Sequence, residues 1–145
     1  MKKKIITLLA FVILAVTTSF AGNEISKNAI STFTGSFAKA TGVTWEKAEK
    51  YYKASFRLNG QSLNALLSEE GEMIAVSRNI LSTELPVSLQ LALNKNISGN
   101  WISELVEYAV HGETKYFITL EDADKKTIFQ SDGTYDWSLF KRIAK

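Results

Sequence analysis

The amino-acid sequence predicts an α+β fold in which two helix-plus-antiparallel-meander repeats form one sheet, with helices packed on one face. Three observations favour this fold. Apolar residues recur every four positions in two stretches, as on one side of a helix. Elsewhere apolar and polar residues alternate, as on a strand with one buried face. Short turns containing glycine separate the alternating stretches. With 145 residues, the chain has room for one domain and its core.

The first 21 residues have the features of a secretory signal peptide. Lys2, Lys3 and Lys4 form a positive n-region, Ile5 to Val16 is an apolar run, and Ser19-Phe20-Ala21 is a small-x-small cleavage site. A membrane anchor is the weaker interpretation, because the run is shorter than the ~20 residues of a spanning helix. We therefore expect residues 1–21 to be a signal peptide and residues 22–145 to be the single mature domain.

The composition narrows the classes of function. Removal of the three n-region lysines changes the formal net charge from +2 to −1, so the mature domain has no electrostatic signature for nucleic acid or for an anionic membrane. The sequence contains no cysteine, which excludes a lipid attached at the cleavage site and leaves the core to hold the fold without disulfides.

The first element of the mature domain is a predicted helix over Asn23 to Ala40. Its apolar stripe has a four-residue spacing and consists of Ile25, Ala29, Phe33 and Phe37. Gly35 weakens the helix, since an internal glycine costs ~1 kcal/mol relative to alanine. Gly42 is the expected stop.

A three-stranded meander follows the helix. Its first strand alternates, and the residues expected to face the helix are Tyr52, Ala54, Phe56 and Leu58. Asn59-Gly60 favours a tight hairpin turn, because both central positions of that turn need positive φ. The return strand is Ser62 to Leu67, a second turn lies at Glu70-Gly71, and Glu72 to Ser77 completes the meander.

The second half begins at Pro86, the one proline, which is well tolerated in the first turn of a helix. The stripe of this helix comprises Leu85, Leu89, Ala92, Leu93 and Ile97, and Ser98-Gly99-Asn100 ends it. The strands expected next are Trp101 to Val110, Lys115 to Glu121, Lys126 to Gln130 and Tyr135 to Ile143.

The two halves have the same predicted order of elements. Each contains a helix, a linker, a tryptophan (Trp45 or Trp101) and strands separated by glycine and acidic turns. We interpret this order as an internal duplication, with repeats at about 24–80 and 84–143.

The sequence resembles the exported PepSY-like and β-lactamase-inhibitor-like tandem-repeat proteins of Bacteroidetes-type bacteria. The similar segments are VTWEKAEKYYKASFRLNG, EEGEMIAVSRNI, the ELP that opens the second helix, and YFITLEDADKKTIFQSDG. Together they span the chain from about Phe33 to the C-terminus. The resemblance implies a two-repeat α+β fold whose antiparallel sheet has an open, concave face that can hold another protein, including a peptidase. It implies no catalytic residues, and the chain lacks the disulfides of the inhibitor proteins proper.

The residues offer little for catalysis or metal binding. His111 is the one histidine and lies in a predicted turn beside Gly112, where a solvated side chain is expected rather than a general base. Without cysteine, the usual zinc sites are also excluded. We therefore predict no catalytic residues, no metal and no cofactor. The acidic segment Glu121-Asp122-Ala123-Asp124 does not have EF-hand spacing, and a weak calcium site there is the minor alternative to a solvated turn.

Four residues are candidates for a binding surface. If Tyr52 faces the helices, Tyr51 has the opposite parity and lies with Lys53 and Arg57 on the uncovered face. Trp137 alternates with polar neighbours near the C-terminus and is the fourth candidate. Exposed tyrosine, tryptophan and arginine are enriched at protein interfaces, although aromatic residues on strands are more often part of the core.

The sequence thus predicts an exported, non-enzymatic binding or inhibitory module of unknown target that uses the open sheet face. A small-ligand, peptide or calcium-binding envelope protein is the alternative, and a hydrolase using His111 is a distant third. The expected location is periplasmic or secreted, the expected partner is an envelope protein or peptidase, and the oligomeric state stays open.

Overall fold

The structure is a computed structural model that describes residues 24–145, so the signal peptide expected over residues 1–21 lies outside the described range. The elements, in chain order, are α2 (Lys27–Ser36), β1 (Thr41–Lys47), β2 (Tyr51–Leu58), β3 (Gln61–Ser68), β4 (Met73–Asn79), the 3₁₀ turn η1 (Ser82–Glu84), α3 (Val87–Asn96), β5 (Trp101–Val110), β6 (Glu113–Glu121), β7 (Lys125–Ser131) and β8 (Ser138–Ala144). Within this range, neither α-helix has the length and hydropathy that a membrane-spanning helix needs.

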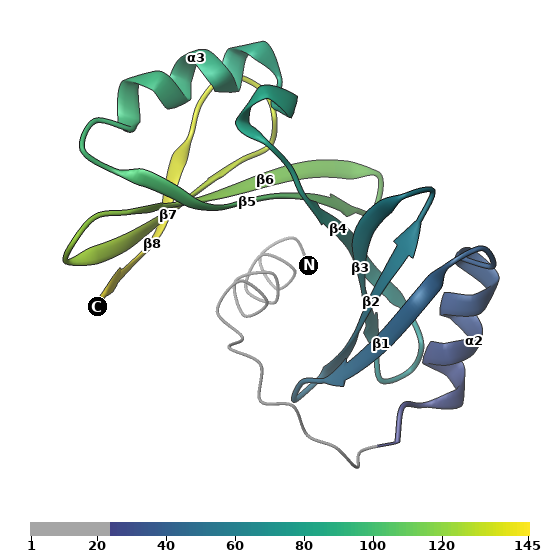
Figure 1. The fold of residues 1–145 in the computed structure, drawn as a ribbon. Helices are drawn as coiled ribbons and strands as arrows, with labels where there is room; N and C mark the ends of the chain where they lie inside the picture. Colours follow the sequence, from purple (N-terminus) through teal and green to yellow (C-terminus); the bar gives the residue numbers. More distant parts are fainter. Residues whose placement is uncertain (1–23) are drawn as a thin grey trace.

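The strands form one antiparallel sheet in which each pairs with the next, from β1 to β8. Figure 1 shows the sheet bent into an arch, with α2 and α3 both on its outer side. We call the side of the sheet that faces the helices the outer face and the opposite side the inner face. The predicted α+β class, with one sheet and helices on one face, is confirmed.

Helix α2 covers the first strands through aromatic contacts. Ser26 is its N-cap, and the Ser26 side chain accepts a hydrogen bond from the backbone N–H of Ala29. The Phe33 ring is edge-on to those of Trp45 and Phe56, at centroid distances of 5.2 and 5.0 Å. Such T-shaped pairs stabilise a core beyond the area that they bury. The predicted stripe is confirmed, with Ala29 and Phe33 buried beneath the helix.

Helix α3 covers the later strands with an aliphatic stripe. Pro86 stands at its N-cap, and Leu89 and Leu93 are buried against Ile118 and Leu120 of β6. Residues three and four positions apart share one side of a helix, which explains why the sequence pattern identified this stripe correctly.

A single strand pair joins the two helix-bearing halves. β4 and β5 are in register from Val76 opposite Ala109 to Asn79 opposite Val106. On the outer face of this junction, Arg78 Nε donates to Glu107 at 2.9 Å, and its Nη1 lies 3.5 Å from Glu84 of η1. The arginine thus ties both strands to the turn that leads into α3.

The structure differs from the sequence expectations at three boundaries. The helix expected over Asn23 to Ala40 ends at Ser36, and Gly42 lies inside strand β1 with φ 61°. The prediction that the first meander has three strands was wrong, because β1 pairs with β2 and makes it four-stranded. The last strand begins at Ser138 rather than at Tyr135.

An ion pair with Glu121 of β6 holds Lys145, the last residue, against the sheet. Glu121 is 8% exposed, and its two carboxylate oxygens lie 2.8 Å from Lys126 Nζ and 2.9 Å from Lys145 Nζ. Lys145 Nζ also lies 4.8 Å from the centre of the Trp101 ring. Hydrogen bonds from Lys126, Lys145 and Ser103 lower the pKa of Glu121 to about 2.

Gly71 allows α2 to approach the turn between β3 and β4. Its φ is 93°, and a Cβ there would lie 2.7 Å from both the carbonyl carbon and the Cβ of Asn28. Gly60 has a similar φ of 80°, but a Cβ there would meet nothing within 4 Å.

These two glycines give a matched pair of stability predictions. Gly71→Ala should lower the free energy of unfolding by about 2–4 kcal/mol, because it adds a backbone clash to the strain of positive φ. Gly60→Ala should lower it by about 1 kcal/mol, from strain alone. Urea denaturation measures both values, and equal losses would show that contact with α2 does not constrain Gly71.

The Glu121 cluster predicts a pH dependence of stability. Since the pKa of Glu121 in the folded protein lies below the ~4.3 of an unfolded chain, its contribution to stability is complete above about pH 5.5. That contribution is lost as the pH falls toward 2. The difference in urea midpoint between wild type and Glu121→Gln should therefore be large at pH 6 and small at pH 2.5.

Glu113→Gln is the control for this titration. The Glu113 side chain is 63% exposed and its carboxylate is 4.0 Å from Lys115 Nζ, so its replacement should change the midpoint little at either pH. A difference for Glu121→Gln that stays constant between pH 6 and 2.5 would contradict the account.

Candidate binding site on the inner face

The centre of the inner face is apolar. A cluster of eight side chains, here called the inner cluster, consists of Tyr51, Leu66, Ala75, Val106, Tyr108, Val110, Phe117 and Ile128. The Phe117 ring is edge-on to Tyr108 at 5.5 Å and to Phe140 of β8 at 5.4 Å. No residue of α2 or α3 belongs to this cluster. The burial of these side chains therefore does not come from either helix.

Two tyrosines of the inner cluster have raised hydroxyl pKa values. Burial raises the pKa of Tyr108, and Glu104 and Tyr51 add to the shift. Burial also raises the pKa of Tyr51, with a smaller contribution from Glu46. Both hydroxyls are therefore neutral at physiological pH, and both side chains are at most 4% exposed.

Glu104 of β5 is a charged residue whose pKa is raised. Loss of water around the carboxyl group raises the pKa of Glu104 on β5, while Lys126 of β7 and Lys53 of β2 both oppose that shift.

Three of the four predicted surface residues share the inner face. Tyr52 packs beneath α2, so Tyr51, Lys53 and Arg57 have the opposite parity, as expected. Tyr51 is 4% exposed within the inner cluster. Lys53 Nζ lies 3.6 Å from Glu46 of β1. Arg57 is exposed near the end of β2.

The expectation that Trp137 belongs to the open face is wrong. Trp137 is 8% exposed in the core beneath α3, and its Nε1 donates to the carbonyl oxygen of Leu89 at 3.2 Å. It lies in the loop before β8, where strand alternation does not apply. Tyr135 in the same loop is 82% exposed.

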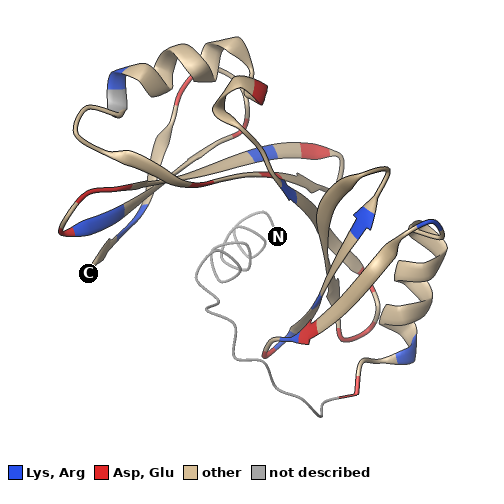
Figure 2. Ribbon diagram, viewed as in Figure 1, with Lys and Arg blue, Asp and Glu red and all other residues tan. Residues whose placement is uncertain are grey.

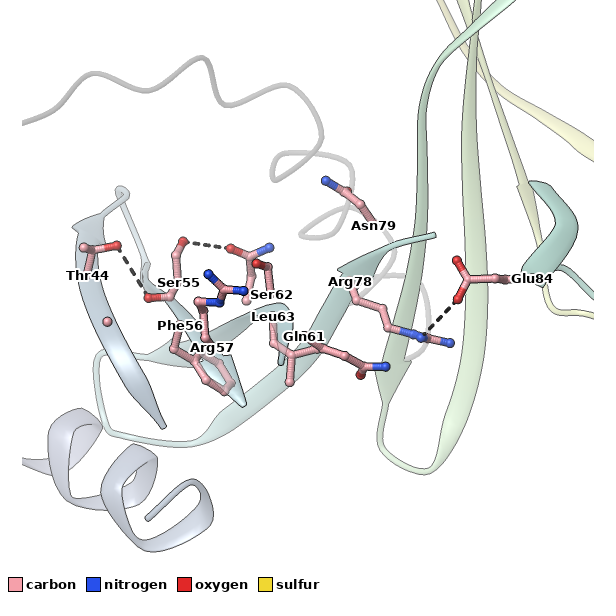
Figure 3. A pocket seen from close by; sticks show the side chains of 12 residues that line it. Thr44, Ser55, Phe56, Arg57, Gln61, Ser62, Leu63, Arg78, Asn79 and Glu84 are labelled. Carbon is pink, nitrogen blue, oxygen red and sulfur yellow. Dashed lines mark hydrogen bonds and ion pairs between the residues drawn. The ribbon is translucent and has the colours of Figure 1, made fainter. Parts of the chain in front are cut away.

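A polar cavity of about 440 Å³ opens where the β2–β3 hairpin meets the end of β4 (Figure 3). Six of its lining residues occupy inner-face positions, namely Thr44, Ser55, Arg57, Ser62, Asn64 and Asn79. Within it, Ser55 Oγ donates to Asn64 Oδ1 at 2.8 Å. Arg78 and Glu84 also line the cavity, and they are paired with each other.

Sequence reasoning missed Ser62 and Asn64, although a signal for them was present. A two-residue Asn-Gly turn fixes the register of a hairpin, and this one has φ 50° at Asn59 and 80° at Gly60. The turn places Ser62 opposite Arg57 and Asn64 opposite Ser55. Asn79 had no such signal, because it reaches the cavity through the pairing of other strands.

The residues considered as a general base or as calcium ligands lie in turns. His111 is exposed with φ 49°, as expected for a turn residue. Asp122 Oδ1 accepts hydrogen bonds from the backbone N–H groups of Asp124 and Lys125, each at 2.9 Å, which also lowers the pKa of Asp122. Among residues 24–145, no group of three or more acidic, histidine or cysteine side chains is placed to hold a metal ion.

Charges of both signs are interspersed over the described chain. In Figure 2, β1 and β6 carry residues of both signs, whereas the other charged strands each carry one sign, acidic on β5 and basic on β2, β4, β7 and β8. Several are matched in ion pairs, such as Lys47 with Glu69 at 3.7 Å. The inner face therefore combines an apolar centre with individual charges rather than a uniform field.

Comparisons with known proteins identify the fold. No protein-family model matches the chain, and no curated protein shows a significant match. Among solved structures, a DUF2874 family protein of Bacteroides ovatus is 20% identical, with a TM-score of 0.71 over 85% of this chain and 89% of that one. A β-lactamase-inhibitor-like (BLIP-like) protein of Bacteroides fragilis is 17% identical, with a TM-score of 0.68 over 88% and 89%.

A third solved structure, of a Bacteroides eggerthii protein thought to be periplasmic, is 12% identical, with a TM-score of 0.72 over 84% of this chain and 90% of that one. All three identities are low, so the similarity concerns the fold. The resemblance to the inhibitor-like proteins of this bacterial group is thus confirmed at that level: the chain has the fold of the DUF2874 and BLIP-like proteins of Bacteroides.

Proposed function

We propose that the protein is an exported, non-enzymatic binding or inhibitory module that holds a protein partner on the inner face of its sheet. The observation that carries this proposal is the inner cluster. It is an apolar and aromatic cluster on the side of the sheet opposite both described helices, and its own side chains are at most 5% exposed. The half-buried Lys53 and Ser55 and the exposed Arg57 on the same face are accessible to a partner. An apolar core bordered by accessible polar and charged groups is typical of protein interaction sites.

The arrangement of β2 supports a partner of protein size. Tyr51, Lys53, Ser55 and Arg57 point to the same face, so this row runs from the inner cluster to the polar cavity over about 20 Å. Tyrosine and arginine are the residue types that most often dominate binding energy at interfaces. An envelope protein or a peptidase is the partner class that the family resemblance implies.

Two observations support an exported location for the mature domain. The sequence pattern of residues 1–21 is that of a secretory signal peptide. One protein with the same fold is thought to be periplasmic. We therefore place the mature domain in the periplasm or outside the cell.

The same order of elements occurs in both halves of the described chain, and we interpret it as an internal duplication. A helix followed by four antiparallel strands occurs first as α2 to β4 and again as α3 to β8. Duplication of a unit with one covered face gives a sheet twice as wide that still has one uncovered face, as a broad binding surface requires.

A small-ligand or peptide-binding envelope protein is the second candidate, and the 440 Å³ cavity favours it. Calcium is the less favoured ligand, because Asp122 already caps two backbone N–H groups. A thermal-shift screen separates these candidates, since a ligand that binds the folded state raises the melting temperature.

The proposal predicts a partner whose capture depends on the inner face. The tagged protein should co-purify one enriched protein from its own cell envelope, and Tyr51→Ala and Arg57→Glu should each reduce that enrichment at least about tenfold. Arg142→Glu, at an exposed position on the edge strand β8, is the matched control and should retain the partner.

Thermal melting of each variant checks that the loss is not due to unfolding, which matters most for the buried Tyr51. A partner retained by both inner-face variants, or lost equally with Arg142→Glu, would place binding elsewhere on the molecule.

A further inference from the structure

Arg57 is a cation that lacks a counter-ion among the described residues. Its neighbour on β2 with the same parity, Lys53, is paired with Glu46 of the adjacent strand. At the level of Arg57, by contrast, the strand partners are Thr41 on β1 and Ser62 on β3, which have hydroxyl groups and no charge. The strand register thus surrounds Arg57 with neutral donors.

The other charges of the polar cavity are already matched. Arg78 contacts both Glu107 and Glu84, at 2.9 and 3.5 Å. The second oxygen of Glu84 accepts a hydrogen bond from the backbone N–H of Leu81 at 2.7 Å. Arg57 is therefore the charged lining residue that remains for a ligand, and Figure 3 shows it on the side of the β2–β3 hairpin, apart from Arg78 and Glu84.

The uncharged lining residues favour an acceptor-rich ligand. Asn64 Oδ1 is occupied by Ser55 Oγ, so the remaining polar group of that amide is its NH₂ donor. Ser62 supplies a hydroxyl and Asn79 a second amide. A guanidinium fork with adjacent hydroxyl and amide donors matches the two oxygens of a carboxylate.

We infer that this cavity is a subsite for an acidic side chain of the bound partner, with Arg57 as its anchor. The inference rests on the proposed function and specifies the partner chemistry. An extended partner segment lies along the inner-face residues of β2 and places an aspartate or glutamate in the cavity beside Arg57. The hydroxyl and amide groups of Ser62, Asn64 and Asn79 complete the contacts of the carboxylate.

The test is a titration followed by two-dimensional ¹⁵N–¹H NMR. The probe is acetyl-Ala-Glu-Ala-amide, and its neutral counterpart is acetyl-Ala-Gln-Ala-amide. The glutamate peptide should shift backbone amides of the cavity, in residues 55–64 and 78–84, in a saturable manner. The glutamine peptide should leave them unchanged at the same concentrations.

Variants assign the effect to the guanidinium group. Arg57→Gln should weaken the apparent affinity at least about tenfold, because a charge-assisted hydrogen bond is lost. Arg57→Lys keeps the charge but not the fork, and should weaken it by a smaller factor. Arg142→Gln is the matched control and should bind as the wild type does. Position 57 is exposed, so these variants should fold, which thermal melting checks.

Inorganic phosphate and acetate test whether the cavity binds the carboxylate of a peptide side chain or a free anion. Saturation by inorganic phosphate without saturation by the glutamate peptide would overturn the inference and indicate a free-anion site. Acetate binding as tightly as the peptide would overturn it in favour of a small acid. Equal shifts from both peptides, no saturable shift, or unchanged affinity in Arg57→Gln would also overturn it.

The outcome is separable from that of the proposed function. If Tyr51→Ala loses the envelope partner but Arg57→Gln retains it, the binding module stands and the carboxylate subsite fails. If the titration succeeds but no partner depends on the inner face, the subsite stands and the protein-binding function fails.

Discussion

The pairing of β4 with β5 is the interaction on which the rest of this structure depends. It joins a four-stranded half under α2 to a four-stranded half under α3 and makes one sheet of eight strands. Arg78 reinforces the junction from the outer face by contacting Glu107 of β5 and Glu84 of η1. Without this pairing the inner cluster would divide, because Leu66 and Ala75 belong to one half whereas Val106 and Phe117 belong to the other. A continuous inner face is therefore a property of the joined sheet, and neither half has it alone.

The alternation of side chains along each strand then determines which face of the sheet each residue points to. On β2, Tyr52, Ala54 and Phe56 pack beneath α2, so the residues between them must point to the inner face. On β6, Ile118 and Leu120 meet α3 while Phe117 joins the inner cluster. Both sides of the sheet are thus apolar at their centres, but helices cover one side alone. This asymmetry, together with an arginine surrounded by neutral groups, is the basis of our proposal that a partner binds the inner face.

Much of this fold could be predicted from the sequence, because its signals are local. Residues four apart in a helix and two apart in a strand share a side, so the stripes of α2 and α3 and the parity of Tyr51 and Tyr52 followed from spacing. β1 was missed because TGVTWEK has no regular alternation and contains a glycine with positive φ. The position of Trp137 could not be predicted, since a loop residue reaches the core through a contact with Leu89, 48 positions away. The cavity depends in the same way on Asn79 and Glu84, which only the assembled sheet brings to the β2–β3 hairpin.

The most direct test of the account is site-specific photo-crosslinking in living cells. Replacing Ser55, a half-buried inner-face residue beside the cavity, with p-benzoylphenylalanine puts the reactive group on the inner face. Replacing Leu91, which is 62% exposed on the solvent side of α3, puts the same group on the outer side. A protein partner crosslinked from Ser55 and not from Leu91 is the result that the account predicts. A partner crosslinked from Leu91 alone, or none from either position, would contradict it.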